Sequence, residues 1–450
     1  MKTRNYTHSI QIDINRCIGC SHCMRVCSTQ AIRIIDGHAR IQPERCIDCG
    51  ECFRVCPQRA IYVKDDGINS ILEDGYNIAL IPSVFFGHFT QGFSVKQVWD
   101  TLKMLGFDEV FEVEQAVDFI KNEFTVYEKK DAPRPVISSF CPAVVRLIQV
   151  LYPSLTRNIM LLKAPQEIAA IYLRFFKTRG DLADKKIYIY YISPCASKIV
   201  ASHSPVGEEK SAIDFSINMT DVFNLVSKKL VGEKCSDVNE SFACMSPDSV
   251  TWSLSGTEKK HFAGRSLAID GMENVIEFLE KLESGHISNI DFLEMRACDQ
   301  GCAGGILCAE NRFLTVERLE KRQKHLVSLV SENSGKISNS LMDNSDELHN
   351  HSGVEPVFAR EGLLLDENME KALIKMQRIN RLTTYFPGFD CGACGAPGCR
   401  NLAEDIVKGN ATISHCVFVQ RIMEKNYKLS PEQSFVLIEK IWGKGRLNKL

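Results

Sequence analysis

Residues 17–27 read CIGCSHCMRVC and residues 46–56 read CIDCGECFRVC, and these two stretches decide the fold of the first part of the chain. Both have the spacing C-x2-C-x2-C-x3-C, and the second stretch begins 29 residues after the first. A repeat of that length is too short to enclose a conventional hydrophobic core. Closely spaced cysteines bind metal as the segment folds, so we expect residues 1–68 to depend on bound metal for their stability.

The chain has nineteen cysteines among 450 residues, which could instead form disulfides. Disulfides need an oxidising compartment, and the first sixteen residues lack the apolar segment of a signal peptide. The most apolar stretch, residues 78–86, is short and contains Pro82, so we expect no membrane-spanning helix. The net charge of -2 gives no indication of binding to nucleic acid or to a membrane surface. These observations predict a cytoplasmic metal-binding protein.

The doubled spacing resembles that of bacterial two-cluster ferredoxins, in which the fourth cysteine of each run binds the other cluster. The resemblance implies two [4Fe-4S] clusters, one bound by Cys17, Cys20, Cys23 and Cys56 and the other by Cys46, Cys49, Cys52 and Cys27. Ser28 replaces the proline that usually follows the first run, a change that removes no ligand. A zinc site or a set of free thiols is the alternative, and the doubled spacing disfavours it.

Another cysteine motif lies near the end of the chain, where residues 389–399 read FDCGACGAPGC. Its spacing is C-x2-C-x4-C-x16-C, formed by Cys391, Cys394, Cys399 and Cys416. The glycines let the backbone approach a cluster and donate N–H groups to its sulfurs. The motif resembles the four-cysteine [4Fe-4S] domain of corrinoid iron–sulfur proteins and membrane redox complexes, with zinc as the alternative. We expect a small helical domain over residues 366–450, with helices at 402–409 and 417–426.

The middle of the chain, residues 77–329, alternates between apolar and amphipathic stretches. We expect strands at residues 77–84, 135–139, 185–193 and 288–295, and helices at residues 95–105, 114–129, 141–153 and 164–176. Strands separated by helices predict an α/β domain with mainly parallel sheets over residues 75–330. The fold class is therefore α/β multidomain, with a ferredoxin-like α+β module before this domain and a helical cluster domain after it.

Cysteines follow three of the expected strands. Cys141 follows the strand at 135–139, Cys195 the strand at 185–193, and Cys298 the strand at 288–295, with Cys302 in the turn GCAGG. The carboxyl ends of parallel strands form the ligand-binding edge of such sheets, so we expect these four thiols to hold a metal group. A buried structural cysteine is the alternative for any one of them.

Three peptides in this domain, SSFCP (138–142), SPCASK (193–198) and EMRACDQGCAGG (294–305), resemble the large catalytic domain of iron-only ([FeFe]) hydrogenases. IPSV (81–84) and KAPQE (163–167) extend the resemblance. It implies a [4Fe-4S] cluster on the four cysteines, with Cys302 bridging to a two-iron unit that carries CO and cyanide. It also implies that Lys198 hydrogen-bonds one cyanide and that the backbone at Pro82 and Ser83 approaches the other.

The sequence departs from this family at four positions. Phe140 replaces the cysteine that passes protons to the two-iron site, and Ala201 replaces a glutamate. Arg296 and Ser193 replace methionines, and Arg296 adds a permanent cation near the site. A phenyl ring cannot relay protons, so we expect slow turnover at most. Either the two-iron unit is present with altered surroundings, or only the [4Fe-4S] clusters remain and the chain carries electrons.

The overall layout resembles that of sensory [FeFe] hydrogenases. It implies four [4Fe-4S] clusters, hydrogen as a ligand, a redox partner protein, and a signalling kinase or phosphatase. Residues 331–360 are polar and predict a flexible linker in which His349 and His351 are solvated. Cys235, Cys244 and Cys308 are left without a predicted role, although Cys308 lies near the expected site.

Overall fold

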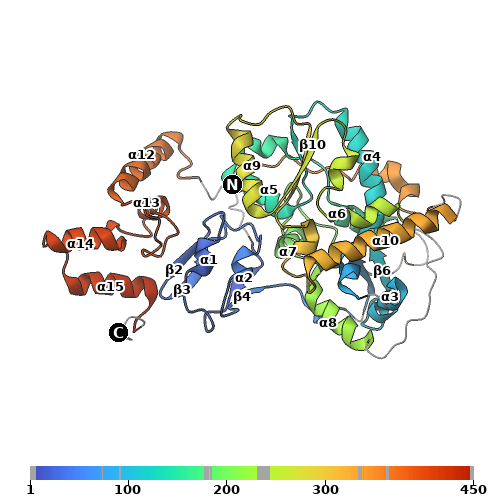
Figure 1. Ribbon diagram of the computed structural model, residues 1–450, viewed down its shortest axis with the longest axis horizontal. Coiled ribbons are helices and arrows are strands. Elements are labelled where there is room, and N and C mark those ends of the chain that lie inside the picture. The colour runs from blue at the N-terminus through green and yellow to red at the C-terminus, as the bar shows by residue number, and fades with distance from the viewer. Residues whose placement is uncertain are drawn as a thin grey trace. The chain divides into compact units, whose positions relative to one another are not determined.

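The computed structural model describes residues 7–72, 74–90, 93–176, 182, 185–230, 244–332, 337, 339–360 and 364–445 (Figure 1). The chain divides into two compact units. One unit is made from both ends of the chain, Met1–Val63 and Ala359–Leu450, and the other is Lys64–Phe358. The two cysteine-rich ends, expected as separate domains, therefore belong to one unit.

The N-terminal part of the first unit has the internal symmetry that its repeat predicts. Strand β1 (Ile10–Ile12) pairs antiparallel with β4 (Ile61–Val63), and β2 (Ile32–Ile35) pairs antiparallel with β3 (His38–Ile41). Two short helices, α1 (His22–Arg25) and α2 (Glu51–Arg54), each contain the third cysteine of a run. The apolar core between them is small, as expected for a module that folds around metal.

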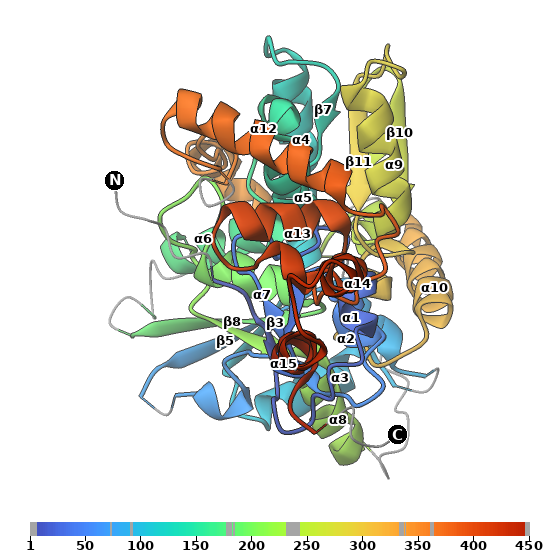
Figure 2. The ribbon, with the colours of Figure 1, turned by 90° about the vertical axis from the view of Figure 1, so that its left-hand side faces the viewer.

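The C-terminal part of the same unit consists of four helices, which are labelled in Figure 2. They are α12 (Met369–Tyr385), α13 (Cys399–Val407), α14 (Val417–Lys425) and α15 (Pro431–Trp442). The expected helices at 402–409 and 417–426 are confirmed as α13 and α14. Their buried faces, together with those of Ile379 and Phe386, form an apolar cluster that includes Cys416.

The described residues of the second unit form two sheets, and the strands paired in each are parallel. The larger sheet has the order β6 (Glu109–Glu112), β5 (Tyr76–Ile81), β8 (Ile187–Ser193), β9 (Phe215–Asn218). The smaller has the order β10 (Ser266–Asp270), β11 (Phe292–Arg296), β7 (Val136–Ile137). The predicted α/β domain with parallel sheets is confirmed, although β6, β9 and β10 were not expected.

Helices follow the strands and cover the sheets, as Figure 1 shows. They are α3 (Val95–Lys103), α4 (Val117–Glu128), α5 (Pro142–Leu151), α6 (Pro165–Phe175), α7 (Ala196–His203), α8 (Met219–Leu230), α9 (Met272–Glu283) and α10 (Arg312–Glu332). Proline is the first residue of α5 and of α6, a position at which a backbone N–H would have no acceptor within the helix. No helix among the described residues is long and apolar enough to cross a membrane.

The segment at 331–360 was expected to be a flexible linker, and its described part is instead folded onto the second unit. It forms helix α11 (Ser345–His349), and Leu341 and Leu348 are fully buried in the apolar core. His349, expected to be solvated, pairs with Glu123 at 2.7 Å. The prediction of a flexible linker was wrong because the burial of two apolar side chains in the core is enough to hold a largely polar segment in place.

Candidate metal centres

In the second unit, the ends of three strands deliver cysteines. The chain leaves β7 and reaches Cys141 as α5 begins, and it leaves β8 and reaches Cys195 as α7 begins. Cys298 follows β11, and Cys302 lies in the 3-10 turn Gly301–Gly304. The order of strands and cysteines that the sequence predicts is therefore the observed one.

Backbone contacts bring these four cysteines into one neighbourhood. The N–H of Ala297 donates to the sulfur of Cys141 at 3.5 Å, next to Cys298. The N–H of Leu307 donates to the carbonyl of Pro194 at 3.0 Å, which ties the GCAGG turn to the segment carrying Cys195. Burial raises the pKa of Cys195 to about 11, and the neighbouring Cys302 thiol raises it further. Four converging thiols are the donor set that a [4Fe-4S] cluster requires.

Two glycines of the GCAGG turn explain why this close approach is possible. A Cβ on Gly304 would lie 2.1 Å from the carbonyl oxygen of Asp299, and a Cβ on Gly305 would lie 2.3 Å from the carbonyl oxygen of Pro194. Neither contact is sterically possible. The glycines are thus required by the packing of the cysteine-bearing segments against each other.

A small cavity adjoins Cys302 in this neighbourhood. Its other lining residues include Pro82, Glu114, Phe140, Lys198, Trp252 and Arg296. Burial alone would lower the pKa of Lys198, but the hydroxyl of Tyr191 and the thiols of Cys302 and Cys195 hold that pKa above its usual value. The ammonium group therefore stays charged beside the cysteines. The indole N–H of Trp252 is buried without a hydrogen-bond partner. A charged ammonium at the cavity suits an anionic group, so Lys198 fits the cyanide ligands of a two-iron unit.

Arg296 was expected to add a permanent cation near this site, and the structure shows that this cation is paired. Its guanidinium forms an ion pair with Glu258, which is fully buried, and its Nε lies 3.6 Å from Oε1 of Glu294. It also donates to the carbonyl oxygen of Trp252 at 3.0 Å. The guanidinium is therefore paired within a buried group of carboxyl side chains, and its charge acts on the cavity less than that of an unpaired arginine would.

Ser83 has partners that the sequence did not predict. Its N–H donates to Oε2 of Glu114 at 2.8 Å, and its hydroxyl donates to Oε1 of Glu112 at 2.7 Å. Because Glu114 accepts the N–H of Ser83, that donor is not directed at a cyanide, whereas Pro82 does line the cavity. Burial raises the pKa of Glu114 to about 8, and the charge of Glu112 adds to the rise. Glu112 itself pairs with Arg322, with Nη2 and Oε2 at 2.9 Å.

Phe140 is part of a buried aromatic group. It is 2% exposed, and its ring stacks on that of Phe124 with centroids 6.1 Å apart and planes at 14°. The ring of Trp252 lies 6.5 Å away. The position beside the ligand Cys141 is therefore filled by a hydrocarbon ring that can neither donate nor accept a proton.

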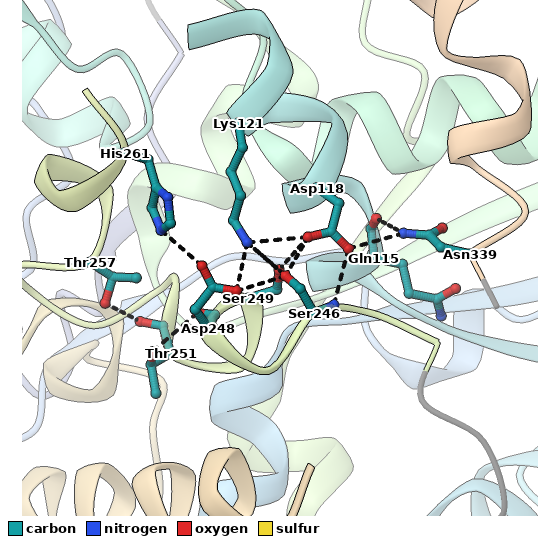
Figure 3. Close-up of polar contacts among 10 residues, drawn as sticks. All are labelled: Gln115, Asp118, Lys121, Ser246, Asp248, Ser249, Thr251, Thr257, His261 and Asn339. Carbon is teal, nitrogen blue, oxygen red and sulfur yellow. Dashed lines mark hydrogen bonds and ion pairs between the residues drawn. The ribbon is translucent and has the colours of Figure 1, made fainter. Parts of the chain in front are cut away.

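The loop that carries Trp252 and Ser253 is held by the polar network shown in Figure 3. Lys121 on α4 reaches Asp118 at 3.2 Å and Asp248 at 2.7 Å, and His261 pairs with Asp248 at 3.0 Å. Burial would raise the pKa of Asp248, but His261 and Lys121 hold it well below its usual value. The carbonyl of Ser253 in turn accepts the N–H of Cys302 at 2.8 Å. The network thus positions one wall of the cavity.

In the first unit the cysteines of the two repeats interleave. Burial, together with the neighbouring thiols of Cys17, Cys20 and Cys56, raises the pKa of Cys23 to about 12. Burial likewise raises the pKa of Cys49 to about 12, with Cys27 as the next contributor. The fourth cysteine of each run therefore lies near the other run, as crossed ligation requires.

Backbone N–H groups point at the cysteine sulfurs in this module. Ala31 donates to Cys27 at 3.2 Å, Ala60 to Cys56 at 3.3 Å, and Ala39 to Cys17 at 3.4 Å. Such bonds are those that surround iron–sulfur clusters, so the residues fit the predicted cofactors. At the C-terminal motif, burial raises the pKa of Cys394 to about 11, with Cys416 and Cys391 among its neighbours.

Sequence reasoning missed the buried carboxyl groups, Glu114, Glu258 and Glu294. A signal existed for Glu114, because it directly follows the short apolar stretch of a strand, at the carboxyl end of the sheet whose strand β8 leads to Cys195. Cys308 donates its S–H to the carbonyl of Cys302 at 3.3 Å, which places it beside the site. Cys235 lies outside the described residues.

Comparisons with known proteins agree with this arrangement. The family described as iron only hydrogenase large subunit, C-terminal domain, matches residues 81–256 and 251–306, which together span half of the chain. A 4Fe-4S dicluster domain matches residues 16–66, and an Fe-S cluster family matches residues 386–418. Both cysteine-rich ends are therefore iron–sulfur domains.

Individual relatives are similar over parts of their length. Iron hydrogenase 1 of Clostridium pasteurianum is 29% identical over 154 residues, which are 32% of this chain and 27% of that protein. A cytosolic Fe-S cluster assembly factor, the NAR1 homolog of Schizosaccharomyces japonicus, is 28% identical over 123 residues, 26% of this chain and 24% of that protein. The chain thus spans about a quarter of the length of these relatives.

Among solved structures, a variant of the [FeFe]-hydrogenase HydA1 from Chlamydomonas reinhardtii is similar with a TM-score of 0.47 and 17% identity, covering 66% of this chain and 96% of that one. The family match over residues 81–306, on a domain whose strand ends gather the four cysteines, determines the relationship. The chain is an iron–sulfur redox protein that belongs to the iron-only hydrogenase large subunit family.

Proposed function

We propose that this protein senses hydrogen or redox state through a hydrogenase-like centre that turns over slowly. In this proposal Cys141, Cys195, Cys298 and Cys302 hold a [4Fe-4S] cluster, and the other twelve motif cysteines hold three more. Cys302 also bridges to a two-iron unit, with Lys198 beside its cyanide ligands. The partners would be a redox protein and a signalling kinase or phosphatase.

The observation that carries the proposal is the burial of Phe140 beside Cys141, at the cavity that Lys198 and Cys302 also line. A two-iron unit, when bound, would bind hydrogen and would support the oxidation or the formation of hydrogen. The chain's own residues can hold an anionic group there, since Lys198 remains charged. Phe140, however, blocks proton transfer at the position where the family relays protons, and general acid–base steps contribute about 10²–10⁴-fold in rate. Binding without fast turnover is what a sensor needs.

The second candidate is an electron carrier with [4Fe-4S] clusters alone. The observation that favours it is the backbone N–H of Ser83, which donates to Glu114 at 2.8 Å and is therefore not directed at a cyanide ligand. A two-iron unit would lack one of the contacts that the family resemblance implies for it. The chain is also similar to a cytosolic Fe-S cluster assembly factor, a protein that is not named as a hydrogenase.

An infrared spectrum of the full chain, co-expressed with the maturation proteins that insert the two-iron unit, separates the candidates. CO and cyanide bands are expected from the proposal. Full [4Fe-4S] loading without those bands would leave the electron carrier. Iron analysis gives a second measure, because the proposal predicts about eighteen irons per chain and the electron carrier predicts about sixteen.

Phe140→Cys tests the role assigned to the buried ring. We expect hydrogen turnover of the matured protein to rise by about tenfold or more, since a thiol restores an exchangeable proton beside the site. Phe140→Ala is the matched control, because it opens the same space without a thiol. An equal rise in both variants, or no rise in Phe140→Cys, would contradict the proposed cause.

A further inference from the structure

The iron–sulfur domains at the two ends of the chain are bonded to each other along the β2–β3 hairpin. The N–H of Ile34 donates to the carbonyl of Gly395 at 2.8 Å, and the N–H groups of Asp36 and Gly37 donate to the carbonyls of Lys440 at 2.8 Å and Ile441 at 2.9 Å. Backbone bonds of this kind fix a register, so the C-terminal domain is docked in a defined position.

Side chains reinforce this docking at its centre. Arg33 on β2 pairs with Asp405 on α13, with Nε and Oδ2 at 2.6 Å and Nη2 and Oδ1 at 3.3 Å, and both side chains are almost fully buried. Asn401 donates to Gln30 at 2.9 Å. A bidentate, desolvated arginine–carboxylate pair requires a specific geometry, which indicates a permanent contact rather than a passing one.

Two routes lead from the C-terminal cysteine loop to one of the ferredoxin clusters. A Cβ on Gly392, which lies next to Cys391, would be 2.9 Å from the Cε of Met24, which lies next to Cys23. Gly395, which follows Cys394, contacts Ile34, whose partner across the hairpin is Ala39. The N–H of Ala39 donates to the sulfur of Cys17 at 3.4 Å. Both routes end at ligands of the same expected cluster.

We propose that the C-terminal cluster and the cluster of Cys17, Cys20, Cys23 and Cys56 form an electron relay, in which electrons pass directly between the two. The first unit then carries a row of three clusters, and the C-terminal cluster lies at one end of that row. One electron passes from a reduced cluster to its oxidised neighbour, without bond making or proton transfer. The second ferredoxin cluster is the next member of the relay, because helices α1 and α2, which carry Cys23 and Cys52, pack against each other. This inference rests on the cluster assignments of the proposed function, and it does not need the two-iron unit.

Electron paramagnetic resonance of the full chain, reduced with dithionite, tests the relay. Neighbouring reduced clusters have interacting spins, so we expect a broadened, split spectrum rather than a sum of isolated signals. Asp405→Ala should remove the part of the splitting that involves the C-terminal cluster at unchanged iron content. The matched control is Asp366→Ala, which breaks the ion pair with Lys375 inside the C-terminal domain and should leave the splitting intact.

The partner cluster is identified by a pair of ligand variants. Cys17→Ser should alter the splitting of the C-terminal signal, whereas Cys46→Ser, in the other cluster, should not. An unsplit wild-type spectrum, or a C-terminal signal that neither Cys17→Ser nor Cys46→Ser alters, would overturn the relay. Sensitivity to Cys46→Ser alone would overturn the assigned neighbour. Missing CO and cyanide bands with the splitting present would reject the two-iron site and leave the relay standing.

Discussion

Glu114 is a buried carboxyl group whose proton is held by its surroundings. It is 2% exposed, lies beside Glu112, and accepts the N–H of Ser83. The folded protein therefore keeps this proton up to a pKa of about 8, against 4.5 for an ordinary glutamate. Between those values the unfolded chain binds fewer protons than the folded one, and the free energy of unfolding falls as the pH rises.

Glu114→Gln is expected to remove this pH dependence. Wild type should lose up to about 1.4 kcal/mol of stability per pH unit from this group between about pH 5 and pH 8, whereas glutamine cannot ionise. Urea unfolding across that range measures the slope. Glu123→Gln is the control, because Glu123 is also buried but accepts from Ser352. Glu123→Gln should lower the free energy of unfolding but keep its dependence on pH. If the free energy of unfolding of Glu114→Gln depends on pH as that of wild type does, the argument is refuted.

At the scale of elements, the loop after residue 246 depends on helix α4 for its position. Lys121 contacts Asp118 and Asp248 as well as the hydroxyl of Ser246 at 2.6 Å (Figure 3). The same loop carries Trp252 to the cavity and presents the Ser253 carbonyl to Cys302. The wall of the site is thus held by a helix that contributes no cysteine.

Lys121→Met should therefore loosen the loop. We expect a loss of about 1–2 kcal/mol in the free energy of unfolding, since the pair is partly exposed, together with a change in Trp252 fluorescence. Lys281→Met is the matched control, because Lys281 pairs with Glu277 in full solvent on α9 and should change stability by less than about 0.5 kcal/mol. Equal effects of the two substitutions would show that the network does not position the loop.

The strands that sequence reasoning found are those with continuous apolar runs. IYIYYIS (187–193) is buried along almost its whole length and was expected as a strand. The strand EVFE (109–112) was missed because its two apolar residues lie between acidic ones and form no apolar run. The strand SLAID (266–270) was missed because it lies half-buried at the edge of its sheet. Edge strands and short strands carry weak patterns, since their pairing is decided by a neighbour far away in the chain.

At the scale of the whole molecule, the two units should respond differently to the loss of iron. The ferredoxin part of the first unit has a small apolar core, whereas the second unit encloses a large one that runs from Ile78 to Leu348. In small metal domains, the free energy of metal binding by the cysteines supplies the free energy of folding.

Iron chelation should therefore unfold the ferredoxin module first. We expect a loss of circular dichroism and rapid proteolysis within residues 1–68, while fragments covering residues 75–330 persist. Addition of iron and sulfide under reducing conditions should restore the protected N-terminal fragment, and untreated protein with its clusters intact serves as the control. Simultaneous loss of both units would contradict the separation.

The sequence alone determined the chemistry of this protein, because cluster ligands within a run lie a few residues apart and their spacing is visible without the fold. The repeats at Cys17–Cys56 and the motif at Cys391–Cys416 were identified in this way, whereas the cysteines after three strands were identified from the expected strand ends and from the peptides that resemble a known family. Only the tertiary structure decided what surrounds those cysteines. It balances Arg296 with Glu258, turns Ser83 toward Glu112 and Glu114, and docks Asp405 on Arg33. These contacts join residues separated by up to 372 positions, and no local pattern specifies which distant side chain a buried charge will find.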